Sequence, residues 1–271
     1  MRSVLLAAIH NGELDNAPAQ QVLDLLVDEG LTQGVIEVHE QPALVVQVNQ
    51  TELQLWRRYQ QHLESRWRNH IDQAGIGREI AARINLNAYR FRLRGSRQFR
   101  NKQWRQRQVE KFVTAKHVRS WKQFLDSTAD ILIVLESDAA ITPDLATTMD
   151  SVLSRLTEPI PTYLNLAGGL NTRDLGIEEL ISGRAHGITT FTRPVTNTSC
   201  AYAINRPLAE QMINFLTASP ESGQLGIDWL FNAYFLYATS HDEPIACLHA
   251  TPPVLLHGSL QGITSSWHPD R

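Results

Sequence analysis

The sequence predicts an α/β protein with a mixed, mainly parallel sheet and helices on both faces. Five consecutive apolar residues, 131–135, follow the breaker Asp130, and such a run is typical of a strand buried on both faces. Apolar residues at three- and four-residue spacing within residues 113–125 predict an amphipathic helix before this strand. A second helix is predicted just after it, with Pro143 in its first turn.

The same patterns, taken in chain order, place the other elements. Apolar or alternating runs predict strands at residues 3–9, 35–38, 44–48, 87–94, 161–166, 189–196 and 200–204. Apolar residues in helical register predict helices at residues 18–29 and 51–73, and helices that begin at Thr142, at Pro207 and near Asp228. Gly75 and Gly77 are expected to end the helix at 51–73, and residues 258–271 are expected to be irregular.

The length of 271 residues permits one large α/β domain or two small ones, and we expect one. Within it, residues 1–86 are expected to form a nucleotide-binding half, 87–122 a basic segment, and 123–271 a half for metal and acceptor. No window has the roughly 18 uninterrupted apolar residues of a membrane span, so we expect a cytoplasmic protein. Cys200 and Cys247 lie in apolar runs and are expected to be buried thiols.

Charge is segregated along the chain. Residues 90–122 contain twelve Lys or Arg and one acid, Glu110, although the whole chain has a net charge of −3. Such a segment is a solvated helix, a surface for phosphates, acidic glycans or a membrane, or a nucleic-acid site. For nucleic acid, the aromatic residues available to stack on bases are Tyr89, Phe91, Phe99 and Trp104. A neighbouring carboxylate site would repel a polyanion, so we expect no nucleic-acid partner.

Two carboxylates, Glu136 and Asp138, stand directly after the buried strand. In open α/β sheets, ligands bind at the carboxyl ends of the strands. Acids at positions i and i+2 there can bring oxygens to one hard cation, Mn²⁺ or Mg²⁺, that also holds a diphosphate. The alternative is a solvated turn. The helices predicted on both sides of the strand favour a site.

The chain resembles glycosyltransferase family 25, the lipopolysaccharide-type and procollagen-type galactosyltransferases. The family has a helix with His and Trp, then a strand ending in Leu-Glu-Asp-Asp-Ala; residues 116–121 here are KHVRSW and residues 135–139 are LESDA. Residues 198–204, TSCAYAI, are similar to the family's Ala-Tyr strand, and residues 227–229 and 252–259 match more faintly. The resemblance covers residues 112–265; the amino-terminal third does not match, and Ser137 replaces an acid of the family.

The resemblance implies a GT-A-like fold and an inverting, metal-assisted transfer of a hexose. The donor would be a UDP-sugar, with galactose as the family default, and the acceptor a hydroxyl of a lipopolysaccharide or another surface glycan, free or lipid-linked. Loss of the second acid at Ser137 also leaves open a catalytically idle partner in a glycan-assembly complex.

Transfer needs a general base for the acceptor hydroxyl, and we expect it to be Asp228. The family has an Asp at this point, and the residue stands where a helix begins, so a simple helix cap is the alternative. A third metal ligand is expected from His257, which follows a near-apolar run; His249 and His117 are lesser candidates.

Groups that bind the donor phosphates are less clearly marked. His10 and Asn11 follow the first predicted strand and precede Gly12, which is a weak phosphate-loop pattern. Lys116, Arg119 or the basic segment would offset the charge of the leaving diphosphate.

Overall fold

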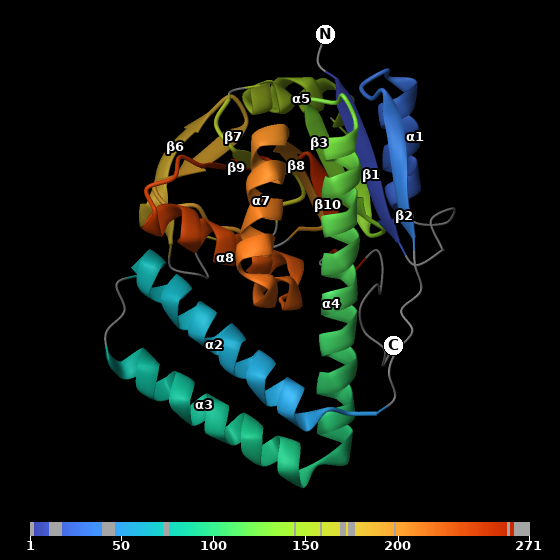
Figure 1. The fold of residues 1–271 in the computed structure, drawn as a ribbon. Coiled ribbons are helices and arrows are strands. Elements are labelled where there is room, and N and C mark those ends of the chain that lie inside the picture. Colours follow the sequence, from blue (N-terminus) through green and yellow to red (C-terminus); the bar gives the residue numbers. More distant parts are fainter. Residues whose placement is uncertain are drawn as a thin grey trace.

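The computed structural model describes residues 3–10, 18–39, 47–72, 76–143, 145–157, 159–168, 172, 177–197, 199–258 and 261–262 (Figure 1). Within this part of the chain, eight strands form one sheet in the order β2-β1-β3-β8-β5-β9-β7-β6. The strands are β1 (Val4–His10), β2 (Gly34–His39), β3 (Ile131–Glu136), β5 (Thr162–Asn165), β6 (Ile181–Ala185), β7 (Ile188–Phe191), β8 (Ala201–Asn205) and β9 (Ala246–Ala250). A separate two-stranded ladder joins β4 (Ala139–Ile141) to β10 (Leu255–His257).

The sheet is mixed, as the sequence predicts. β1 pairs in parallel with β2 and β3, and β5 pairs in parallel with β9, whereas β8 is antiparallel to both β3 and β5. Following these pairings across the described sheet, β7 and β8 run against the direction shared by the other strands. Most strands of the described sheet therefore point in one direction, as the sequence predicts.

Helices cover both faces of the sheet, which confirms that prediction. Helices α1 (Pro18–Asp28) and α5 (Leu145–Leu153) lie on one face, and α4 (Arg97–Asp126), α7 (Arg206–Ala218) and α8 (Ile227–Ser240) lie on the other (Figure 1). Side chains alternate along β3: Ile133 packs with the first group, whereas Leu132 and Val134 pack with the second. The apolar run of β3 is thus buried on both faces.

A helical arm, which comprises α2 (Gln50–Asp72), α3 (Ile76–Gly95) and the amino-terminal half of α4, extends away from the sheet (Figure 1). It has a small core of its own, made of Leu53, Trp56, Tyr89, Leu93 and Trp104. Trp67 Nε1 donates a hydrogen bond of 3.0 Å to Asn232 Oδ1, which ties α2 to α8. Ser96 caps α4, since its Oγ accepts a 3.2 Å bond from the backbone N–H of Phe99.

The predicted strand at residues 87–94 is wrong, because this segment is the end of α3. Tyr89 and Leu93 are buried while Phe91, between them, is 77% exposed. Burial at positions i and i+4 is a helical period, which a short alternating segment does not distinguish from a strand. Gly77 also lies inside α3, so it ends no helix.

Other boundaries differ for local reasons. The strand predicted at 44–48 lies mostly outside the described residues, and Gln47 and Val48 form no strand. The strand predicted at 189–196 stops at Phe191, before Pro194, which has no N–H to give to a ladder. Strand β6 has the sequence ISGRA, and its last four residues are exposed, so no apolar run marks it.

The predicted boundaries at residues 86/87 and 122/123 fall inside α3 and α4. β1, from the segment expected to bind the nucleotide, pairs directly with β3, so the first and third predicted segments share one sheet. Of the aromatic residues proposed to stack on bases, Tyr89 and Trp104 are buried in the arm.

Among the described residues, no helix combines the length and the apolarity needed to cross a bilayer.

Candidate functional site

The two predicted acids lie where β3 ends, near the middle of the sheet. Glu136 is the last residue of β3, and Asp138 occupies the turn that leads into β4. The main chain of this turn is fixed by its neighbours: Glu136 N–H donates to Cys200 O at 2.8 Å, and Ser137 N–H donates to Ile9 O at 3.1 Å. The acids therefore stand on a rigid edge between β1 and β8.

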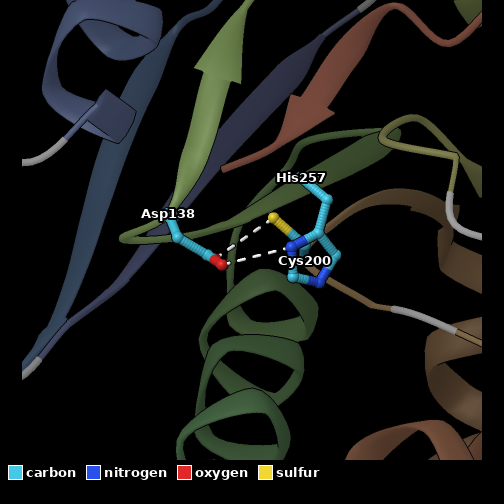
Figure 2. A group of neighbouring side chains, drawn as sticks. All are labelled: Asp138, Cys200 and His257. Atoms are coloured by element: carbon cyan, nitrogen blue, oxygen red, sulfur yellow. Dashed lines mark hydrogen bonds and ion pairs between the residues drawn. The ribbon is translucent and has the colours of Figure 1, made fainter. Parts of the chain in front are cut away.

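Asp138 is surrounded by two other possible metal ligands (Figure 2). Cys200 Sγ lies 3.2 Å from Asp138 Oδ1, and His257 Nδ1 lies 3.2 Å from Asp138 Oδ2. One ligand atom from each of the three residues lies within 4.8 Å of the others. The structure thus brings together Asp138 and His257, as expected for metal ligands, and adds Cys200.

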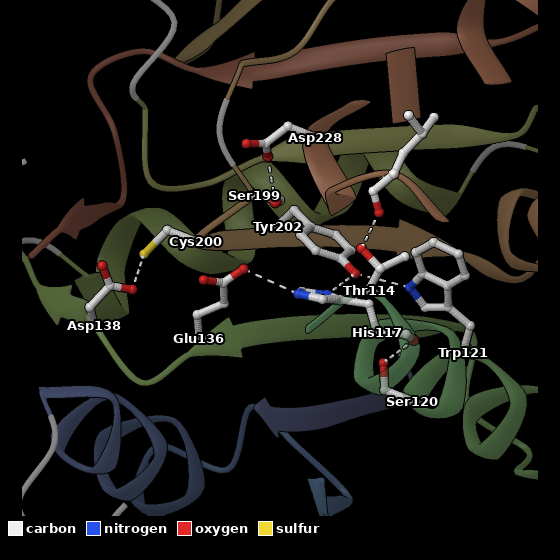
Figure 3. Close-up of polar contacts among 11 residues, drawn as sticks. Thr114, His117, Ser120, Trp121, Glu136, Asp138, Ser199, Cys200, Tyr202 and Asp228 are labelled. Atoms are coloured by element: carbon white, nitrogen blue, oxygen red, sulfur yellow. Dashed lines mark hydrogen bonds and ion pairs between the residues drawn. The ribbon is translucent and has the colours of Figure 1, made fainter. Parts of the chain in front are cut away.

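Glu136 turns toward a different partner (Figure 3). Its Oε1 lies 3.1 Å from Nε2 of His117, whose Nδ1 lies 2.8 Å from the hydroxyl of Tyr202. Trp121 Nε1 donates to the same hydroxyl at 2.9 Å. Since an indole N–H only donates, the tyrosine hydroxyl accepts from Trp121 and can donate to His117, which leaves Nε2–H to donate to Glu136.

Burial governs the protonation of this pair. Burial, together with the nearby charge of Asp138, raises the pKa of Glu136 to about 8. Burial, together with the charge of Lys116, lowers the pKa of His117 to about 3. The buried imidazole is therefore neutral near pH 7. It holds the Glu136 carboxyl, which is itself mostly protonated at this pH, in one orientation.

Asp228 reaches the same edge from the first turn of α8. Its Oδ1 accepts a 2.6 Å hydrogen bond from the hydroxyl of Ser199, next to Cys200. Burial and the charge of Glu136 raise the pKa of Asp228 to about 7, although the Ser199 bond lowers it. Asp228 is not the cap of its helix, since the N-cap is Gly226.

Other predicted residues are placed as follows. His10 ends β1 beside this turn, and its carbonyl accepts a hydrogen bond from the buried Lys116 ammonium. Asn11 lies outside the described residues. Arg119 is exposed, two residues after His117 and so on another side of α4, and the structure does not place it with the acids.

His249 is not in this group, because its Nε2 bonds the carbonyl of Val195. Burial lowers the pKa of His249 to about 4. Cys200 and Ser199, in contrast, carry contacts with Asp138 and Asp228 that the sequence did not predict. The only signal was their place just before the Ala-Tyr strand.

Comparisons with known proteins assign no family. No protein-family model matches the chain, and no curated protein matches it in sequence. One similar solved structure is described as "Crystal structure of a glycosyltransferase involved in the glycosylation of the major capsid of PBCV-1". It has 8% sequence identity and a TM-score of 0.30, over 80% of this chain and 68% of that chain. A likeness at this TM-score does not establish a shared fold.

The chemistry open to the site follows from its geometry. Asp138, Cys200 and His257 offer oxygen, sulfur and nitrogen to one cation. Asp228 has a pKa close to neutrality, which suits a group that takes up and releases a proton. The site therefore combines a candidate metal centre with a candidate general base.

Proposed function

We propose that the chain transfers a hexose from a UDP-sugar to a hydroxyl group of a glycan, on a GT-A-like fold. The observation that carries the proposal is the meeting of three carboxyl groups: Glu136 and Asp138 from the end of β3, and Asp228 from α8. Besides burial, the charge of Asp138 raises the pKa of Glu136, and the charge of Glu136 raises the pKa of Asp228. Such a concentration of acid is unfavourable for folding and is typical of a functional site.

Asp228 is the proposed general base. Its ionised carboxylate takes the proton of the acceptor hydroxyl as the oxygen bonds to the anomeric carbon. The bond from that carbon to the diphosphate breaks at the same time, and its electron pair leaves with the nucleoside diphosphate. Because the pKa of Asp228 is about 7, a large fraction of the carboxyl is ionised at neutral pH. Ser199 holds one carboxylate oxygen in place, and the proton uptake is assigned to the other.

The donor end of the site is assigned to Asp138 and His257. A divalent cation bound there would neutralise charge on the departing diphosphate. Asp138 and Cys200 are almost fully buried, and His257 is partly exposed. Glu136, held by His117 at 3.1 Å, stands beside this centre and would be drawn toward its ionised form by a bound cation. Galactose and a lipopolysaccharide-type acceptor remain the choice implied by the family resemblance.

The test is hydrolysis of a panel of UDP-sugars by the full chain, with and without added divalent cations. We expect cation-dependent release of UDP from at least one sugar, and loss of that release in Asp138→Ala. Asp126→Ala, an exposed residue at the end of α4, is the matched control and should behave as the parent. Equal turnover by the parent and Asp138→Ala would refute the proposal.

Asp228→Asn tests the base separately. Asn cannot take the acceptor proton, and loss of a general base lowers the rate by about 10²- to 10⁴-fold. An amide oxygen can still accept from Ser199, so the melting temperature should change little. Turnover within about threefold of the parent would exclude Asp228 as the base. Asp242, described near the end of α8, would then be tested, as would Asp174, which lies outside the described residues.

A further inference from the structure

We propose that Cys200 is a metal ligand, so that Asp138, Cys200 and His257 form a site for a thiophilic divalent cation such as Zn²⁺ and select it over Mg²⁺ and Mn²⁺. The role of this cation in the reaction rests on the proposed function. Its binding does not, because binding follows from the three side chains themselves.

The ligand atoms are already close to the spacing that a zinc ion requires. With Zn–S near 2.3 Å and Zn–N or Zn–O near 2.0–2.2 Å, neighbouring ligand atoms of a tetrahedral site lie about 3.3–3.6 Å apart. The Cys200 sulfur and the His257 nitrogen each lie 3.2 Å from an oxygen of Asp138. All three groups fall within 4.8 Å (Figure 2). Small side-chain rotations would therefore suffice to enclose the ion.

The main chain holds the three residues in place. His257 lies opposite Ala139 in the β10–β4 ladder, and Gly258 N–H donates to Asp138 O at 2.8 Å. On the other side, Cys200 O accepts from Glu136 N–H at 2.8 Å. Each ligand is thus fixed to the same turn by backbone hydrogen bonds, which is the preorganisation that a metal site needs.

The donor set determines which cation fits. Mg²⁺ and Mn²⁺ favour carboxylate, carbonyl and water oxygens, whereas a thiolate and an imidazole favour Zn²⁺. When the cation binds, the sulfur–metal bond replaces the S–H bond and the proton leaves to solvent. Three protein ligands leave a fourth position open, as in catalytic zinc sites, and a diphosphate oxygen is a suitable occupant.

The experiment uses the full chain without a histidine tag, stripped of metal and titrated with Co²⁺ as a spectroscopic substitute for Zn²⁺. We expect a near-ultraviolet thiolate-to-cobalt charge-transfer band that Zn²⁺ abolishes and excess Mg²⁺ does not. Cys200→Ser should lose the band and weaken Zn²⁺ binding by at least about tenfold. Cys247→Ser is the matched control, because Cys247 is also buried but its thiol bonds the Val195 carbonyl; it should keep the band.

Three results would overturn the proposal: no cobalt bound by the parent, bound cobalt without the band, or a band that survives in Cys200→Ser. X-ray absorption of the zinc-loaded parent needs no variant and covers the case in which Cys200→Ser fails to fold. It should show one sulfur at about 2.3 Å from zinc. Only nitrogen and oxygen scatterers would refute Cys200 as a ligand.

The readouts separate this inference from the proposed function. A thiolate band in a protein that hydrolyses no UDP-sugar would support the metal site and reject the transferase. Cation-dependent hydrolysis without any thiolate band would support the transferase and reject Cys200 as a metal ligand.

Discussion

Replacing Glu136 by Gln should make the protein more stable at neutral pH while removing its turnover. Glu136 is held in place by His117 at 3.1 Å, and a Gln amide can keep that hydrogen bond. The shape of the side chain is almost unchanged, so the substitution removes chiefly the ability to ionise. The raised pKa of Glu136 means that the folded protein resists that ionisation.

The magnitude follows from proton linkage. The pKa of Glu136 is about 8 in the folded protein, and its ordinary value is 4.5. Between these values the unfolded chain has lost the proton and the folded chain retains it, so folding takes up a proton and the free energy of unfolding falls as pH rises. One proton corresponds to about 1.4 kcal/mol per pH unit. From about pH 5 to pH 7, ionisation of Glu136 in the unfolded chain should lower the free energy of unfolding of the parent by about 3 kcal/mol. Glu136→Gln should not show this decrease.

His117 acts in the opposite direction. Its pKa is lowered from 6.5 to about 3, so the unfolded chain binds the extra proton and stability rises with pH until about 6.5. His117 is present in both proteins, so its contribution is common to both and the difference between them reports chiefly on Glu136.

The assay is urea unfolding of both proteins, without added metal, at several values between about pH 5 and pH 8. Glu210→Gln, at an exposed position on α7, is the matched control and should follow the parent. Parallel curves for the parent and Glu136→Gln across this range would refute the raised pKa. A Gln variant with full UDP-sugar hydrolysis would remove Glu136 from the proposed site.

Three further predictions concern the supports of the site and the basic segment. Tyr202→Phe removes the hydroxyl shared by Trp121 and His117 and leaves their buried polar groups unpaired. The free energy of unfolding, measured in urea, should therefore fall by about 1–3 kcal/mol. An unchanged urea midpoint would contradict this network. Trp67→Phe removes the bond to Asn232 and should increase protease cleavage in the helical arm before the sheet unfolds, whereas cleavage at the parental rate would show that the bond does not anchor the arm. A random oligonucleotide should bind with a dissociation constant of about 10⁻⁴ M or weaker at physiological salt, and tight, sequence-dependent binding would revive the nucleic-acid alternative.

The structure narrows what the basic segment can contact. Arg107 is almost fully buried, and it lies 4.0 Å from a carboxylate oxygen of Glu52. Arg100 donates to the carbonyls of Leu93 and Arg94 at the end of α3, where a cation is favourable. Part of the positive charge that the sequence shows therefore stabilises the arm. Arg97 and Arg105 are exposed and stay candidates for an anionic acceptor or a membrane surface.

Local pattern determined much of the fold. The apolar run of β3 has no polar residue to expose, which favours an interior strand, and the structure buries all five of its residues. Pro18 and Pro207 begin or nearly begin α1 and α7, because proline is preformed for a first helical turn. The acids at 136 and 138 were located at the strand end by spacing alone.

Only the tertiary structure decided what those acids contact. Cys200 reaches Asp138 across 62 residues of sequence because β8 pairs antiparallel with β3, and His257 reaches it because β10 pairs with β4. Ladder hydrogen bonds between distant segments set these partners, and nothing in the local sequence encodes their register. The same limit applies to residues 87–94, where packing in the arm, with Tyr89 and Leu93 buried on one side of a helix, overrode an alternating pattern.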